Sequence, residues 1–211
     1  MKRIYLRSIY YTAGIVILTL GIALTIQSKL GTSPFDALLV GLYRTYGLTI
    51  GSWEIVVGFS MIIFNSIAEK RRPELIALFT SLLTGAGIDF WVHLFRGWIE
   101  PEAIIPQYVC LLVGLVISGL GIAVNLQADF APNPFDRMML VLRNLTGLNV
   151  SLSRAIISIV LVILAAFFGG AIGIGTLIIA VLSGFVIHFF MGYTNRLDGW
   201  LSEATPSYQK Q

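Results

Sequence analysis

Charged residues, cysteine and histidine are all scarce in this sequence. Aspartate, glutamate, lysine and arginine together make up 12% of the 211 residues, whereas a soluble domain averages about 25%. So few charges cannot easily cover a protein surface that faces water. Cys110 is the only cysteine and lies inside an apolar run, which excludes an intramolecular disulfide and argues against redox chemistry.

The motifs of the common enzyme classes are also absent. The chain has no Walker loop, dinucleotide fingerprint, HExxH pair or GxSxG nucleophile elbow. Its two histidines, His93 and His188, fall in different halves of the chain, so no metal constellation is visible. We therefore expect no enzyme activity, metal or cofactor. The net charge of +3 indicates no nucleic-acid partner, because the basic residues flank apolar segments.

Apolar residues dominate the chain instead. They make up 56% of it, the mean hydropathy is +0.85, and runs of about 20 apolar residues are typical of membrane spans. The first run, Ile9 to Ile26, is too long for a signal peptide and is expected to be a retained helix. The sequence predicts an all-α membrane protein with six spans, at about 9–29, 50–68, 74–95, 107–127, 151–169 and 173–192.

The chain contains an internal repeat with an offset of 100 residues. When residues 14–48 are laid on residues 114–148 without a gap, fourteen of thirty-five positions are identical, including Pro34-Phe35-Asp36 and Pro134-Phe135-Asp136. A weaker match, with an offset of 99, joins Thr84-Gly85 to Ser183-Gly184. We therefore divide the chain into a first repeat (1–100), a second repeat (101–200) and a polar tail (201–211).

Each repeat also contains a helix that is too short to span a bilayer. Residues 34–46 and 134–145 have apolar side chains at helical spacing. A helix of about thirteen residues is about 20 Å long, against a hydrocarbon core of about 30 Å. We expect each short helix to lie at the interface or to enter the membrane and return.

The distribution of basic residues fixes the expected topology. With a cytoplasmic N-terminus and three crossings per repeat, three basic residues, Lys29, Arg44 and Arg96, lie outside and eleven lie inside, as the positive-inside rule requires. The eleven are Lys2, Arg3, Arg7, Lys70, Arg71, Arg72, Arg137, Arg143, Arg154, Arg196 and Lys210. An odd number of crossings makes the repeats antiparallel, as in many transporters. Both termini are then cytoplasmic.

The two Pro-Phe-Asp motifs have two interpretations that both stay open. Ser33 and Asn133 are good N-cap residues, proline suits the first helical turn, and Asp36 and Asp136 complement the helix dipole. On this interpretation the motifs are ordinary helix starts. On the other, the two short helices direct their N-termini at one cavity, where the two aspartates bind solute or carry protons.

Polar residues near the ends of spans are further candidates. Gln27, Asn125 and Gln127 either hydrogen-bond between helices, which we favour, or line a solute path. Asp89 and His188 follow matched motifs of the two repeats and are candidates for proton-linked groups, because an ionisable residue within a span is costly. Both lie near enough to a span end to reach water.

The first copy of the repeat carries a family resemblance. Gly21-Ile22-Ala23, Gln27, the segment Gly31 to Asp36 and the segment Gly47 to Gly51 resemble the YczE/YyaS-like family of bacterial integral membrane proteins, which is related to YitT-type proteins. The resemblance covers essentially the whole chain. It implies a multi-pass protein of the bacterial cytoplasmic membrane without the soluble C-terminal domain of many YitT-type proteins. It implies no substrate and no functional residues.

Two functions of different classes follow from these features. The leading hypothesis is a small-solute transporter or permease with its site between the inverted repeats. The alternative is a non-transporting accessory protein that docks a membrane-associated enzyme through Arg137, Arg143 and the tail. Six spans form a small bundle for a complete pathway, so a homodimer is expected in the first case.

Overall fold

The computed structural model describes residues 2–128, 130 and 133–203, and these residues form eight α-helices and no strands. The helices are α1 (Lys2–Gln27), α2 (Pro34–Tyr46), α3 (Ile50–Glu69), α4 (Leu75–Phe95), α5 (Ile104–Leu126), α6 (Pro134–Thr146), α7 (Val150–Phe167) and α8 (Ile174–Glu203).

Six of these helices are long and apolar enough to cross a membrane, as the sequence predicted. They are α1, α3, α4, α5, α7 and α8, whereas α2 and α6 contain 13 residues each. The one sizeable difference is at the end of the chain. The last span was expected to end near 192 and the polar tail to begin at 201, but α8 continues to Glu203. Of the predicted tail, residues 204–211 lie outside the described residues.

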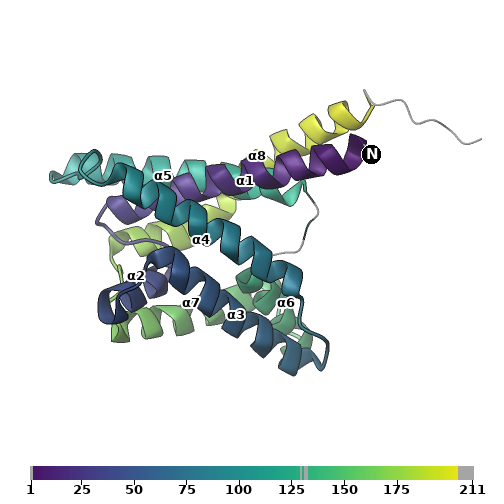
Figure 1. Cartoon of the computed structure of the whole chain (residues 1–211), viewed down its shortest axis with the longest axis horizontal. Helices are drawn as coiled ribbons and strands as arrows, with labels where there is room; N and C mark the ends of the chain where they lie inside the picture. Colours follow the sequence, from purple (N-terminus) through teal and green to yellow (C-terminus); the bar gives the residue numbers. More distant parts are fainter. Residues whose placement is uncertain (1, 129, 131–132, 204–211) are drawn as a thin grey trace, which may run out of the picture.

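The helices form two layers (Figure 1). Helices α1, α5 and α8 lie in one layer, and α2, α3, α6 and α7 lie in the other, with α4 crossing between them. The beginning of α1 and the end of α8 lie at the same end of the bundle. The largest core cluster joins α2 to α3 and α7, around Leu38, Leu39, Met61, Ile157 and Leu161.

The tightest packing in the bundle is between α1 and α5, which run antiparallel (Figure 1). A Cβ atom at Gly21 would overlap the backbone of Ser118, and one at Gly121 would overlap the backbone of Leu18. The two contacts are equivalent, because a shift of 100 residues relates Gly21 to Gly121 and Leu18 to Ser118. Each contact joins one of these positions in one half to the other position in the other half. Helical glycines therefore let the two backbones touch, as small residues do in membrane helix pairs.

The same exchange relates most other helix pairs. Helix α1 packs on α4 as α5 packs on α8, α2 packs on α7 as α6 packs on α3, and α2 packs on α3 as α6 packs on α7. One pair has no counterpart. Helices α3 and α4 pack closely through Gly51 and Gly85, whereas α7 and α8 do not form such an interface in the described part of the chain. Gly184, the repeat counterpart of Gly85, accordingly has no atom near the position of an added Cβ.

Candidate functional site

Local sequence explains why the two short helices begin where they do. Ser33 caps α2: its Oγ accepts a hydrogen bond from the Asp36 N–H at 3.2 Å and donates one to Asp36 Oδ2 at 2.5 Å. Asn133 caps α6 by accepting from the Phe135 N–H at 3.1 Å. Both helices carry proline in their first turn, where its missing N–H costs nothing. The motif is therefore a capped helix start in both repeats.

The fold brings the N-termini of the two short helices together, which the local sequence could not predict. The rings of Phe35 and Phe135 lie with centroids 5.9 Å apart and planes tilted by 37°. Pro134 is fully buried, and its carbonyl accepts a hydrogen bond from the Asn65 side chain of α3 at 3.3 Å. The two Pro-Phe-Asp motifs thus form one site inside the bundle, which we call the helix-start site.

Asp36 is buried and Asp136 is half-buried, and the two aspartates of the helix-start site have different neighbours. Burial raises the pKa of Asp36, against a smaller opposite effect of the hydrogen bond from Ser33. Burial also raises the pKa of Asp136, and the positive charge of Arg154 on α7 partly offsets this. The removal of solvent penalises the charged form of a carboxyl group. The site therefore favours protonation of Asp36 more than a surface position would.

A third acidic residue, Glu54 of α3, belongs to the same region. Its side chain is 1% exposed, its Oε1 has no hydrogen-bond partner, and it interacts electrostatically with Asp36. Glu54 was not among the candidates from the sequence. An acid inside an apolar run was the signal available in the sequence.

The repeat relates these neighbours in an informative way. Glu54 and Arg154 occupy the same repeat position, since their numbers differ by 100. In the first half, Asp36 therefore has an acid beside it, and in the second half Asp136 has an arginine beside it. The two halves share their helix starts but have opposite electrostatics.

The three predicted amide positions are not part of the helix-start site. Gln127 donates from Nε2 to Asn195 Oδ1 at 2.8 Å and to Thr194 Oγ1 at 3.2 Å, which joins the end of α5 to α8. Asn125 donates to the Tyr11 carbonyl at 3.3 Å, which joins α5 to α1. Gln27 is half-buried in the last turn of α1. Hydrogen bonding between helices, the role that we favoured, accounts for Asn125 and Gln127.

The predicted proton-linked pair is not brought together either. Asp89 Oδ1 accepts a hydrogen bond from the Gly51 N–H at 2.8 Å, so its carboxylate caps the start of α3. His188 is exposed on α8. Asp89 lies one helical turn of α3 away from Glu54, whereas His188 belongs to the opposite layer.

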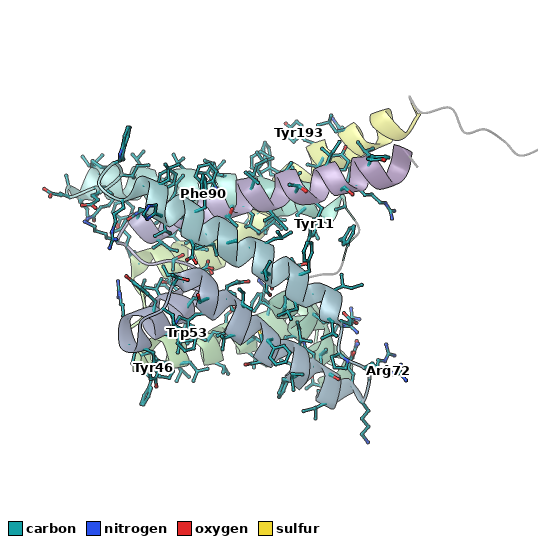
Figure 2. All side chains as sticks on the ribbon, in the orientation of Figure 1. Tyr11, Tyr46, Trp53, Arg72, Phe90 and Tyr193 are labelled. Atoms are coloured by element: carbon teal, nitrogen blue, oxygen red, sulfur yellow. The ribbon has the colours of Figure 1, made fainter. Side chains whose placement is uncertain are left out.

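The two ends of the bundle present different polar residues. At one end, a cavity of about 180 Å³ is lined by Lys29, Arg44 and backbone atoms of the loop before α8. Arg44 also donates to the Gly169 carbonyl at 2.9 Å. Figure 2 shows Tyr46 and Trp53 at this end and Arg72 at the other. The positive charge of Lys29 and Arg44 at this end favours the approach of anions or of neutral solutes with hydrogen-bond acceptor groups.

At the opposite end, α6 is tied to the loop between α3 and α4. Arg137 makes ion pairs with Glu69 at 2.9 Å and with Glu74 at 3.0 Å. Arg71 and Arg72 line a hollow of only about 20 Å³ beside them. The segments 69–74 and 137–144 therefore lie side by side. Among the described residues, no group of three histidine, cysteine, aspartate or glutamate side chains could hold a metal ion.

These features define the chain as a multi-pass α-helical membrane protein with a polar site between two short helices. Residues 5–192 match the model of a family described as a family of unknown function, DUF6198. The chain belongs to this family, and its resemblance to YczE/YyaS-like proteins is confirmed by two relatives from Bacillus subtilis (strain 168).

The similarity to these relatives extends over nearly their whole length. The chain is 44% identical over 191 residues to "Uncharacterized protein YyaS", covering 90% of this chain and 95% of the relative. It is 33% identical over 189 residues to "Uncharacterized membrane protein YczE", covering 89% and 86%. An "Uncharacterized protein" of Haemophilus influenzae is 24% identical over 182 residues, covering 86% and 81%. No solved structure matches the chain.

Proposed function

We propose that this protein is a small-solute transporter or permease of the bacterial cytoplasmic membrane, with both termini cytoplasmic and no covalent chemistry of its own. The observation that carries the proposal is the meeting of the two Pro-Phe-Asp helix starts, with Phe35 and Phe135 in contact and Asp36 buried beside them. Short helices whose N-termini point into the bundle are a recurring way to build a transporter site at the membrane midplane.

Two inverted repeats are the second part of the proposal. The antiparallel packing of α1 and α5 supports it, because Gly21 meets Ser118 where Gly121 meets Leu18. The ends of the short helices add the same relation: Arg44 donates to the carbonyl of residue 169, and Asn144 donates to the side chain of residue 69. Contacts that are exchanged by a shift of 100 residues are what a two-fold axis in the membrane plane produces.

The charges at the two ends support the orientation. Arg137 pairs with Glu69, next to the basic stretch Lys70-Arg71-Arg72, so basic loops from both halves gather at one end. Lys29 and Arg44 line a cavity at the other. Since eleven of the fourteen basic residues belong to the first group under this topology, that end is assigned to the cytoplasm.

The mechanism that we propose is a rocking of the two halves around the helix-start site. The difference between the halves supports it: α3 packs closely on α4 through Gly51 and Gly85, whereas their counterparts α7 and α8 do not pack in this way. In an alternating-access cycle the second state exchanges the conformations of the two repeats. In that state α7 closes on α8 and Gly184 takes the place that Gly85 has here.

Solute would meet four side chains at the helix-start site: Ser33, Asp36, Asn133 and Asp136. Their caps leave the helix N-termini largely satisfied, so a strongly bound anion is not favoured there. Carboxyl groups largely removed from water suit a neutral solute with several hydroxyl or amide groups, which the positive charge of Lys29 and Arg44 also admits. Gln27, Asn125 and Gln127 act in this scheme between the helices that surround the site.

Thermal stabilisation by a panel of solutes tests the proposal. Purified full-length protein in detergent is heated with separate members of several classes: amino acids, polyamines, sugars and carboxylic acids. We expect one class to raise Tm, and radiolabelled members of that class to accumulate in proteoliposomes. Asp36→Asn and Asp136→Asn should abolish both effects, whereas Glu102→Gln, an amide change at an exposed loop residue, should keep them. Failure of every class to stabilise or accumulate would contradict the proposal.

The accessory role is the second candidate, and one observation favours it. Four arginines, Arg71, Arg72, Arg143 and Arg196, are exposed and would form a basic cytoplasmic surface. The positive-inside rule explains the same residues without a partner, so the transporter is the better supported proposal. Co-purification of one stoichiometric cytoplasmic protein, lost on Arg143→Glu and accompanied by no solute effect, would favour the accessory role.

A further inference from the structure

We infer that Glu54 and Asp36 share one exchangeable proton and that this carboxyl pair is the proton-coupling site of the protein. The inference rests on the proposed function, since it names the coupling ion of the proposed transporter. Its central residue, Glu54, was not singled out by any sequence motif, and the case for it is geometric.

The surroundings of Glu54 cannot support an isolated negative charge. Its side chain is 1% exposed and its Oε1 has no hydrogen-bond partner, and it belongs to a helix that is long and apolar enough to span the membrane. A buried carboxylate without a partner costs several kcal/mol or more. The group must therefore bind a proton or a cation.

Asp36 is the charged group that acts on Glu54 among the described residues, and it has the same sign. One oxygen of Asp36 already accepts the Ser33 hydroxyl at 2.5 Å. Two carboxyl groups that lie close together in a buried site keep one proton between them, because both cannot be ionised at once.

Buried hydroxyl groups on α4 face the same part of α3. The Ser81 hydroxyl lies against Gly58, one turn after Glu54, and Gly85 lies against Gly51, one turn before it. Thr84 lies between Ser81 and Gly85 along α4, three residues after Ser81 and therefore on the same side of the helix. Both Ser81 Oγ and Thr84 Oγ1 are buried without a hydrogen-bond partner. Unpartnered hydroxyls next to a carboxyl pair are able to bind the proton-bearing form or a water molecule that delivers a proton.

The other charged groups on the helices packed against α3 have partners of their own. On α4, Asp89 accepts from the Gly51 N–H. On α6, Asp136 interacts with Arg154 of α7, and Arg137 pairs with Glu69 and Glu74. On α2, Arg44 donates to the Gly169 carbonyl, and on α6, Arg143 donates to the Asn144 side chain. His93 of α4 is exposed. Among the described residues, Glu54 and Asp36 form no ion pair with an arginine or lysine. Asp136 thus interacts with an arginine, whereas Asp36 interacts with an acid. Each chain therefore has one carboxyl pair that can share a proton.

Infrared titration of the full-length protein in lipid tests this inference without any solute. The carbonyl band of protonated carboxyl groups is followed from acidic to alkaline pH in a sodium-free buffer. We expect wild type to keep one protonated carboxyl group at neutral pH. Glu54→Gln should remove that band, and Asp36→Asn should shift it, because Glu54 then holds the proton next to an amide. Glu74→Gln, the matched change in an exposed ion pair, should leave the band unchanged.

Three results would overturn the inference. The first is a neutral-pH band that survives in Glu54→Gln or is unchanged in Asp36→Asn. The second is the absence of such a band in wild type. The third is the loss of the wild-type band on adding sodium chloride at constant pH, because the ligand would then be a sodium ion. Size-exclusion profiles and helical circular dichroism show whether each variant is folded, and the two separate variants keep the test decisive if one of them is not.

This test separates the proton site from transport. If the titration succeeds and no solute is transported, the carboxyl pair exists and the proposed function fails. If solute uptake is found but is independent of a proton gradient, and the band is absent, the protein is a transporter coupled in another way.

Discussion

Phe35 and Phe135 occupy the same position of the two repeat copies, and their rings lie in contact with centroids 5.9 Å apart. Each ring is the second residue of its short helix. The contact therefore fixes the distance between the two helix N-termini, and with it the spacing of the acidic residues that follow. The helix-start site depends on this pair more directly than on any other contact.

Truncation of this aromatic pair should weaken the whole bundle. We expect Phe35→Ala to lower the free energy of unfolding by about 3 kcal/mol, because Phe35 is buried among the core residues of α2. Phe135→Ala should cost less, since Phe135 is only partly buried. The double variant should show a coupling of about 1 kcal/mol between the rings, measured by denaturant unfolding in mixed micelles. Strict additivity would show that the rings are not in contact.

Two glycines of the α1–α5 contact provide a second prediction. Gly21→Ala and Gly121→Ala should each lower Tm strongly, because the added methyl group would overlap the backbone of the facing helix. The controls are Gly184→Ala and Gly192→Ala, where nothing lies near an added Cβ. Those changes should leave Tm the same or raise it slightly, since alanine favours helix over glycine by about 1 kcal/mol. Equal effects at all four positions would contradict the packing.

The local parts of the fold were accessible from sequence, and the reason is physical. Ser33-Pro34 and Asn133-Pro134 specify helix starts through caps and a fixed φ angle, so the predicted first residues of α2 and α6 agree with the structure. Apolar run length similarly placed six spans within a few residues. Each of these signals is contained within one segment of chain.

Relations between distant segments were not accessible in the same way. The repeat indicated that the halves are alike, but it could not indicate that Glu54 and Asp36 interact electrostatically, because pairing across helices depends on tilt and rotation. The repeat also concealed a difference: Gly85 and Gly184 match in sequence, yet only Gly85 packs against a neighbouring helix. Asp89 and His188 match too, but one caps α3 and the other is exposed.

The side of the membrane on which each loop lies gives a third prediction. In a Cys110→Ala background, single cysteines at Lys70 and Arg143 should react with a membrane-impermeant maleimide only from the cytoplasmic side. Cysteines at Arg44 and Arg96 should react only from the outside. Lys70 and Arg143 each lie one residue from Glu69 and Asn144, whose side chains are hydrogen-bonded to each other at 3.4 Å. Labelling of Lys70 and Arg143 from opposite sides would contradict the inverted arrangement.

The buried Asp36 carboxyl group should make stability depend on pH. Burial raises the pKa of Asp36 above 3.8, the ordinary value of an aspartate in the unfolded chain. Between these two pKa values the folded protein still binds a proton that the unfolded chain has released. In that window the unfolded state binds fewer protons, and the free energy of unfolding falls as pH rises. The stabilisation is fully present below the unfolded pKa and is lost as pH passes the folded one.

Asp36→Asn checks the sign of this effect. We expect wild type to be more stable at pH 4.5 than at pH 7.5, by about 1 kcal/mol or more, in thermal or denaturant unfolding. The asparagine variant should show a much smaller difference between the two pH values. Asp89→Asn is the comparison, because Asp89 is an acid of the same region whose Oδ1 accepts a hydrogen bond from the Gly51 N–H. A stability of wild type that rises between these pH values would mean that other carboxyl groups dominate.

The unequal packing of the two halves leads to the last prediction. Gly51 and Gly85 touch across α3 and α4, whereas their counterparts Ser151 and Gly184 belong to helices that do not pack together. If the halves exchange conformations, Ser151 and Gly184 must approach each other in the second state. In a Cys110→Ala background, Ser151→Cys with Gly184→Cys should therefore form a disulfide under mild oxidation. That requires Cα atoms within about 7 Å, so the bond reports closure of α7 on α8.

Two matched pairs make this experiment interpretable. Ser151→Cys with Gly192→Cys places the second thiol about two turns further along α8, and it should not cross-link. Gly58→Cys with Ser81→Cys joins positions of α3 and α4 where an added Cβ lies 3.1 Å from the facing Cβ, and it should cross-link in the state seen here. Because trapping α7 against α8 would hold the protein in one state, the first cross-link should also stop solute uptake, and reduction should restore it. If the Gly58 and Ser81 pair links readily while the Ser151 and Gly184 pair never does, the two halves do not exchange conformations, and the rocking mechanism is wrong.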